Sequence, residues 1–137
     1  STISSVLPSM IFHRRGHIVH LSSQAAKSVP AGFAVYAATQ QFATTFLSGL
    51  RAEMSKHNVK LSTIQPGDVA NTELIMKNSD QEAADKMGVE IGKPVGTGFN
   101  EFQLLQASDV ADAVVYAVTA PPNVAVNEIL IEPRDQE

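Results

Sequence analysis

The spacing of apolar residues differs from segment to segment along this chain, and the segments predict helices that alternate with strands. Apolar residues at helical spacing over residues 4–12 predict the last turns of a helix. Residues 16–22 are a short β-rich run between turn residues, which predicts a strand. Similar runs over residues 59–64 and 124–132 predict two more strands, and Pro66-Gly67 closes the first of them.

The longest helical pattern covers residues 35–57, after the Pro30-Ala31-Gly32 break. Its apolar residues recur at intervals of three and four and are predicted to form one wide apolar face. Asn58 follows the pattern and is typical of a helix end. The residues of this face are Phe42, Ala43, Phe46, Leu47, Leu50 and Met54.

A further helix is predicted near the C-terminal end of the sequence. Ser108 is expected to cap its start, and Pro121-Pro122 to end it. Five small or branched apolar residues fall on one side of this helix and are expected to face the core. They are Val110, Ala113, Val114, Ala117 and Val118.

Strands that alternate with helices imply right-handed crossovers and a parallel sheet. The predicted fold class is therefore α/β, a three-layer αβα arrangement with part of a doubly wound parallel sheet. We expect residues 1–137 to form one domain, with an unpaired edge on the first strand. Ligands of such sheets bind beyond the carboxyl ends of the strands.

Residues 68–106 differ from the rest of the chain. Gly88, Gly92, Gly96 and Gly98 interrupt them, and only residues 79–87 have a helical pattern. A connection of this length inside a compact domain is typically functional or mobile. We therefore expect a mobile loop here.

Composition narrows the class of protein. Apolar residues make up 44% and charged residues 18%, which is typical of a globular chain rather than a disordered one. The net charge of −4 argues against a nucleic-acid partner. The sequence has no cysteine, no apolar run long enough to span a bilayer and no leader pattern, so we expect a cytoplasmic protein without membrane contact.

Two hydroxyl side chains stand where this architecture places reactive groups. Ser23 follows the first strand, and Tyr36 opens the long helix thirteen residues later. A serine hydroxyl beside a tyrosine phenol suits proton transfer to a carbonyl oxygen, because each can donate or accept a hydrogen bond. A metal site is not expected, because His17 and His20 would point to opposite faces of their strand. A serine hydrolase is disfavoured, because the serines lack the G-x-S-x-G turn.

Residues 16–67 resemble the short-chain dehydrogenases/reductases, whose pattern is a strand reading roughly G-x-I-x-x-x-S-S, then Y-x-x-x-K, then a strand ending in P-G. The matching segments are Gly16-His17-Ile18-Val19-His20-Leu21-Ser22-Ser23, Tyr36-Ala37-Ala38-Thr39-Gln40 and Gln65-Pro66-Gly67. The resemblance continues through Ser108-Asp109-Val110-Ala111 and Asn127-Glu128-Ile129-Leu130-Ile131-Glu132-Pro133, and that ending looks like the NADP-linked reductases of hydroxy acids and other carbonyls. It implies the C-terminal half of a Rossmann-type fold.

The resemblance also implies roles. Ser23 would hold and polarise the substrate oxygen, and Tyr36 would be the general acid/base during hydride transfer between a carbonyl or alcohol substrate and NADP or NAD. Pro66, Gly67 and Val69 would line the nicotinamide side of the pocket. Either Asn71 or Thr72 would take the place of the family's threonine, and the loop over residues 68–106 would close over the substrate.

The sequence departs from the family pattern at Gln40, where the family has a lysine that binds the nicotinamide ribose and lowers the pKa of the tyrosine. Loss of that cation would cost on the order of 10- to 1,000-fold in rate. The family's glycine-rich phosphate loop has no counterpart in the sequence. The alternative to an enzyme is therefore an inactive remnant that acts as an interaction module.

The resemblance implies two protein partners. The helix over residues 35–57 would pack against its counterpart in a second copy, although its apolar face could equally be core against the sheet. An N-terminal half carrying the phosphate loop would complete the cofactor site.

Overall fold

The computed structural model describes residues 2–23, 32, 34–70, 85 and 104–134. Within these residues, three parallel strands form one sheet in the order β1-β2-β3: β1 (Gly16–Leu21), β2 (Val59–Pro66) and β3 (Glu128–Ile131). The helices are α1 (Thr2–His13), α2 (Ala34–Met54), which runs into the 3-10 turn η2 (Ser55–His57), and α5 (Ala107–Val118). The predicted α/β class and parallel sheet are confirmed.

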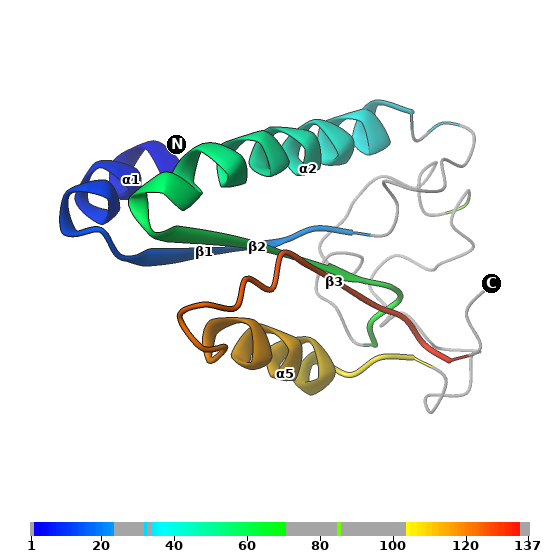
Figure 1. Ribbon diagram of the computed structural model, residues 1–137. Helices are drawn as coiled ribbons and strands as arrows, with labels where there is room; N and C mark the ends of the chain where they lie inside the picture. Colours follow the sequence, from blue (N-terminus) through cyan, green and yellow to red (C-terminus); the bar gives the residue numbers. More distant parts are fainter. Residues whose placement is uncertain (1, 24–31, 33, 71–84, 86–103, 135–137) are drawn as a thin grey trace.

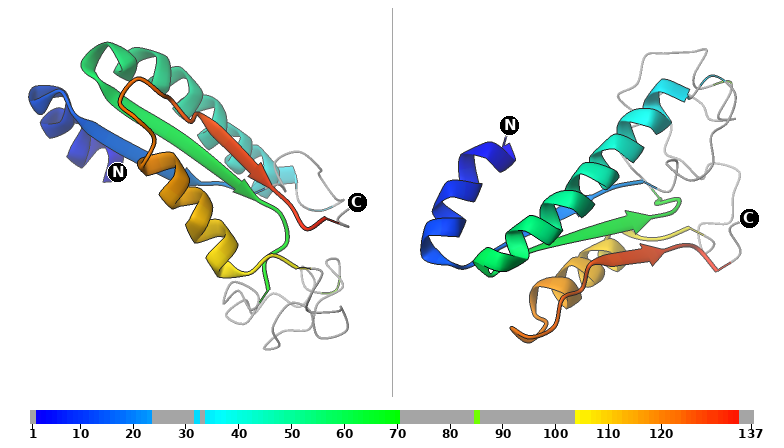
Figure 2. Two further views of the ribbon diagram at one scale, coloured as in Figure 1. Left: turned by 60° about the horizontal axis from the view of Figure 1, so that its bottom comes forward. Right: turned by 45° about the horizontal axis from the view of Figure 1, so that its top comes forward.

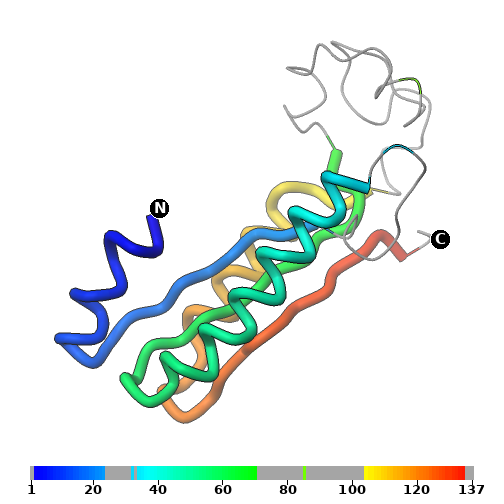
Figure 3. The backbone as a smooth tube through the Cα atoms, turned by 90° about the horizontal axis from the view of Figure 1, so that it is seen from above, coloured from blue at the N-terminus to red at the C-terminus, as the bar shows by residue number. Residues whose placement is uncertain are grey.

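The helices cover both faces of the sheet. In Figure 1, α1 and α2 lie above the strands and α5 lies below them. The two views in Figure 2 show the same three layers from other sides, and the view from above in Figure 3 shows α1 beside β1 and α2 along the middle of the sheet. The strands all end at the side of the molecule where α2 and α5 begin.

The buried core lies where the end of α2 packs on the start of β2. Fully buried apolar side chains need no hydrogen-bond partner, and each stabilises a fold by about 1.5–3 kcal/mol relative to exposure. The centre of this cluster is Leu47, Met54, Val59 and Leu61. Partly buried side chains from α1, β1 and α2 complete it, namely Ile3, Leu7, Met10, Ile11, Ile18 and Leu50.

The end of the long helix agrees with the sequence pattern. Asn58 has a left-handed backbone with φ 59°, and its N–H donates to the carbonyl of Ser55 at 3.2 Å. Asparagine tolerates this conformation better than most residues. Its side-chain amide also donates to the carbonyl of Arg14 at 2.9 Å, which joins this turn to the start of β1.

The third strand is shorter than predicted. It covers Glu128–Ile131, whereas the apolar run indicated residues 124–132. Side chains of β2 bind the carbonyls that precede it: Lys60 Nζ donates to the carbonyl of Val124 at 2.7 Å, and Ser62 Oγ to that of Val126 at 2.5 Å. These two carbonyls accept hydrogen bonds from side chains rather than from the backbone of a neighbouring strand. The predicted strand was therefore wrong at its amino-terminal end.

The predicted start of α5 was also wrong. Gln106, not Ser108, is the N-cap, with an extended backbone at φ −93° and ψ 156°. Its N–H donates to the Asp109 carboxylate at 2.7 Å, as in a capping box. The predicted apolar side of this helix is confirmed for Ala117, which is 1% exposed, but Val118 is 47% exposed.

The predicted single apolar face of α2 divides into two. Leu47 and Met54 are buried against the sheet, together with Ala37, whereas Phe42 and Phe46 are 71% and 52% exposed. The two phenylalanine rings stack on each other with centroids 6.1 Å apart. Packing on the sheet therefore does not account for this pair.

Candidate functional site

The carboxyl ends of β1 and β2 meet the amino end of α2 at one side of the molecule (Figure 1). Ser22 and Ser23 follow β1, Pro66 ends β2, and Tyr36 lies in the first turn of α2. The parallel sheet therefore brings to one edge residues that lie far apart in the sequence. This edge is where open α/β sheets bind their ligands.

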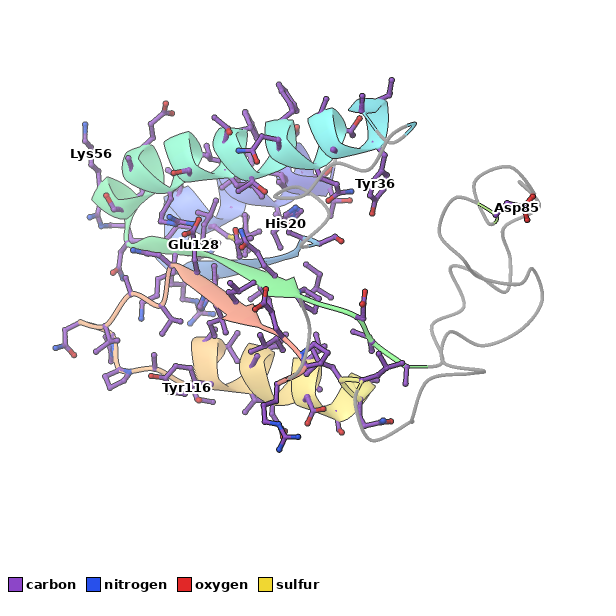
Figure 4. The ribbon with its side chains drawn as sticks, turned by 90° about the vertical axis from the view of Figure 1, so that its right-hand side faces the viewer. His20, Tyr36, Lys56, Asp85, Tyr116 and Glu128 are labelled. Atoms are coloured by element: carbon purple, nitrogen blue, oxygen red, sulfur yellow. The ribbon has the colours of Figure 1, made fainter. Side chains whose placement is uncertain are left out.

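Tyr36 and Gln40 are four residues apart on α2, so their side chains lie one turn apart on the same side of the helix. Figure 4 shows the Tyr36 side chain hanging from the first turn of α2 toward the carboxyl end of the sheet, with Lys56 at the opposite end of the helix. The tyrosine is 41% exposed and Gln40 is half-buried. The phenol is thus accessible to a ligand. One turn further along the same side of α2, the side chain is the uncharged amide of Gln40.

Ser22, just after β1, is held by a backbone contact and by a side-chain contact. The Ser22 N–H donates to the carbonyl of Ile64 at 2.8 Å, which continues the β1–β2 ladder by one bond. The Ser22 side chain is buried, and its Oγ lies 3.5 Å from Thr44 Oγ1 of α2. Ser23, the predicted oxygen-binding residue, is the next residue and is half-buried.

The end of β2 is tied to β3 and to the start of α5. The Gly67 N–H donates to the carbonyl of Ile131 at 2.7 Å. Val69 and Leu105 form a parallel bridge, in which the Ala70 N–H donates to the Leu105 carbonyl at 2.8 Å. The two ends of the predicted loop over residues 68–106 are therefore joined at the carboxyl end of β2.

Most of that loop lies outside the described residues. Asn71 and Thr72 are among the residues outside, so the choice between them stays open. Of the helix predicted over residues 79–87, only Asp85 is described, and it is helical.

The two histidines of β1 have different surroundings. His17 Nε2 lies 2.7 Å from Ser62 Oγ, and burial together with the charge of Lys60 lowers its pKa. His20 lies between α2 and the sheet in Figure 4. Burial lowers its pKa, and its Nε2 is buried with no hydrogen-bond partner among the described residues. Among the described residues no group of three or more histidine and acidic side chains could hold a metal ion.

The chemistry of this edge fits the nicotinamide end of a dinucleotide. Ser23, Tyr36 and Gln40 carry neutral hydrogen-bonding groups, and Pro66 and Val69, at and just after the end of β2, carry apolar side chains. A nicotinamide ring needs an apolar wall, and its ribose needs hydrogen-bond partners. The described residues of the predicted set therefore lie at one edge of the sheet, and their role in cofactor binding stays a prediction.

Residues 1–83 match the sequence profile of the family described as short chain dehydrogenase. The chain belongs to this family. It is 38% identical over 136 residues to the glycine betaine reductase ATRR of Emericella nidulans, a match covering 99% of this chain and 10% of that protein. A probable NADP-dependent dehydrogenase of Haemophilus influenzae is 31% identical over 133 residues, covering 96% of this chain and 48% of that protein.

Solved structures agree with the family. The closed form of a serine dehydrogenase complexed with NADP⁺ superimposes with a TM-score of 0.75 at 29% identity, covering 98% of this chain and 50% of that one. The Rossmann-type fold is thus confirmed for the part that the chain contains. The chain spans about half the length of these dehydrogenases and a tenth of the reductase.

Sequence reasoning missed two features of this edge. One is the Ser22–Thr44 contact, although the spacing of Tyr36, Gln40 and Thr44 at intervals of four already places them on one stripe of the helix. The other is the Val69–Leu105 bridge, which no local pattern signals because it joins residues far apart in the chain. Within the described part, no helix combines the length and the apolar character that crossing a membrane requires.

Proposed function

We propose that this chain forms part of an oxidoreductase that interconverts a carbonyl and an alcohol with a nicotinamide cofactor. The observation that supports it best is the placement of Ser23, Tyr36 and Gln40 at the edge where β1 ends and α2 begins, in a chain of the short-chain dehydrogenase family. Two hydroxyls and an amide at one edge can bind and protonate a carbonyl oxygen.

Each residue has a separate role in this proposal. Ser23 binds the substrate oxygen and polarises the carbonyl. Tyr36 donates a proton from its phenol oxygen to that oxygen in the reductive direction and accepts it in the oxidative direction. Gln40 hydrogen-bonds the ribose through its amide, without supplying the charge that a lysine would add.

The cofactor of the proposal is NADP or NAD. When bound, the nicotinamide supplies or accepts the hydride. Pro66, Gly67 and Val69 line its side of the pocket, and one of Asn71 and Thr72 follows them. The similarity to a probable NADP-dependent dehydrogenase and to a serine dehydrogenase complexed with NADP⁺ favours NADP.

The proposal includes self-association through α2 and a complementary N-terminal half that holds the cofactor phosphates. Phe42 and Phe46 are exposed and stacked, and such pairs in aqueous proteins commonly mark a contact surface. The β1 strand pairs with β2 along one edge only among the described residues, so its other edge could accept a further strand. The proposed compartment is the cytoplasm.

The second candidate function is an interaction module without catalysis, and the neutral Gln40 at the family's lysine position favours it. The two candidates differ in whether turnover occurs. The test uses the full-length protein with two probe substrates. L-serine would be oxidised at its alcohol with NADP⁺, and betaine aldehyde, the aldehyde that corresponds to glycine betaine, would be reduced with NADPH. Nicotinamide absorbance reports turnover in both directions.

Tyr36→Phe is expected to lower turnover of an accepted probe by about 100-fold or more, because a positioned general acid/base contributes about 10²–10⁴-fold. The matched control is Tyr116→Phe, because Tyr116 is also exposed, at 65%, but lies on α5 in the other helical layer (Figure 4). Activity that survives Tyr36→Phe unchanged would refute the assignment. Absence of turnover for every probe in the folded wild-type protein would favour the interaction module.

A further inference from the structure

The buried contact between Ser22 and Thr44 lies beside the proposed site but is not part of it. Ser22 is 8% exposed, so its hydroxyl needs a partner inside the protein. Its Oγ lies 3.5 Å from Thr44 Oγ1, and Thr44 Oγ1 in turn lies 3.1 Å from the carbonyl oxygen of Gln40. A hydroxyl has one proton, and a carbonyl can only accept.

These constraints fix the direction of the contacts. Thr44 donates its single proton to the Gln40 carbonyl, so Ser22 must be the donor toward Thr44. The chain of hydrogen bonds therefore runs from the end of β1 through Thr44 to the second turn of α2. It joins the residue before Ser23 to the residue one turn after Tyr36.

The backbone of Ser22 is held as well, because its N–H donates to the Ile64 carbonyl at 2.8 Å. Ser22 is thus attached to β2 through its backbone and to α2 through its side chain. The peptide that follows it leads directly to Ser23. The Ser22–Thr44 contact thus connects the end of β1 to the second turn of α2, close in the chain to both proposed catalytic hydroxyls.

We propose that Thr44 is a positioning residue for the reaction, which sets the distance between Ser23 and Tyr36 by anchoring Ser22. This rests on the proposed function. Thr44 itself is half-buried one turn deeper than Gln40, so it acts through Ser22 and does not touch substrate. Small displacements of reacting groups lower rates strongly, because catalysis needs the reacting atoms in close alignment.

The test compares Thr44→Val, which removes the hydroxyl and keeps the shape, with Thr44→Ser, which keeps the hydroxyl. The control is Thr45→Val: Thr45 is exposed on the same turn, where its Oγ1 accepts a hydrogen bond from Gln41 Nε2 at 3.3 Å. All variants are made in the full-length protein, and turnover of an accepted probe is measured with saturating nicotinamide.

Thr44→Val is expected to lower kcat by about 3- to 10-fold with little change in KM, because Ser23 and Tyr36 are then less closely aligned during the reaction while Thr44 makes no contact with substrate. Thr44→Ser and Thr45→Val are expected to stay within about twofold of wild type. A merely structural role would lower stability without this kcat effect. An unchanged kcat in Thr44→Val would overturn the proposal and leave the proposed function intact.

Hydrogen exchange provides a readout that does not depend on turnover. In Thr44→Val and in Ser22→Ala, the amides of residues 20–23 are expected to exchange faster than in wild type, by a similar factor in both variants. The double variant is expected to exchange no faster than either single variant. Thr45→Val is expected to leave them unchanged. Exchange at these amides that is identical in all variants would overturn the proposal even if no probe were turned over.

Discussion

Restoring a positive charge beside the phenol is the sharpest perturbation that the site offers. Gln40→Lys places an ammonium one turn from Tyr36, on the same stripe of α2. Two unit charges about 6 Å apart interact by about 1.4–2.8 kcal/mol at an effective dielectric constant of about 20–40, which equals about 1–2 pKa units. Tyr36 is 41% exposed, so solvent screening keeps the effect at the lower part of the general range of about 1–3 units.

We therefore expect Gln40→Lys to raise turnover by about 10- to 100-fold at neutral pH and to move the pH optimum downward. The gain should occur in both directions, because a more acidic phenol is the better acid for reduction and is more ionised for oxidation. The assay is the pH–rate profile of the full-length protein with NADPH or NADP⁺. A second expected change is a lower KM for the nicotinamide, because lysine can also bind the ribose.

Two controls separate this prediction from its rivals. Tyr36→Phe in the Gln40→Lys background should remove the gain, because the phenol is the group that the charge acts on. Gln40→Met, which is uncharged and of similar length, should give no gain. If Gln40→Lys folds and still shows no turnover, the catalytic reasoning is refuted and the interaction module is preferred.

Three other outcomes follow from the structure. Gly16→Ala should lower the free energy of unfolding by about 1–3 kcal/mol in a urea titration, because the added Cβ would lie 2.5 Å from a side chain of α1, whereas Gly49→Ala has open space and should raise it by about 0.5–1 kcal/mol. Burial lowers the pKa of both His17 and His20 below 6.5, so their contribution to the free energy of unfolding should be full above pH 6.5 and be lost as the pH falls toward the lowered values; His20→Asn should reduce this slope and leave the part due to His17. Replacing Phe42 and Phe46 by glutamine should yield a smaller species in sedimentation velocity with unchanged helical circular dichroism; an unchanged species would contradict contact through these rings.

The elements that the sequence predicted well are those whose patterns are local. The spacing of apolar residues in α2 and the turn chemistry at Asn58 act within a few residues, and the structure has both where they were expected. The parallel sheet was predicted from the alternation of strands and helices alone. Local periodicity gave the helix but not which of its sides is buried, because Phe42 and Leu47 are equally apolar and only packing on β2 distinguishes them.

The features that sequence could not predict depend on contacts between distant residues. The short β3 reflects Lys60 and Ser62 of β2, which bind the carbonyls before the strand, and no pattern within residues 124–132 indicates this. The start of α5 depends on the Asp109 carboxylate binding the Gln106 N–H. Ser22 was predicted only as the neighbour of Ser23, because its partner on α2 becomes apparent only when β1 packs beneath that helix.

The residues of the buried core and the residues of the proposed site lie at opposite ends of the same helix and strands. The core cluster of Leu47, Met54, Val59 and Leu61 joins the end of α2 to the start of β2. The proposed site joins the start of α2 to the ends of β1 and β2, where the described contacts are mostly single hydrogen bonds between polar groups. Changes in the core should therefore act on unfolding and leave the pH–rate profile of the surviving folded protein unchanged. A change at Gln40 should act on the pH–rate profile, and a change at Thr44 should act on kcat. This separation makes a kinetic effect of either residue interpretable, because loss of the fold is measured independently.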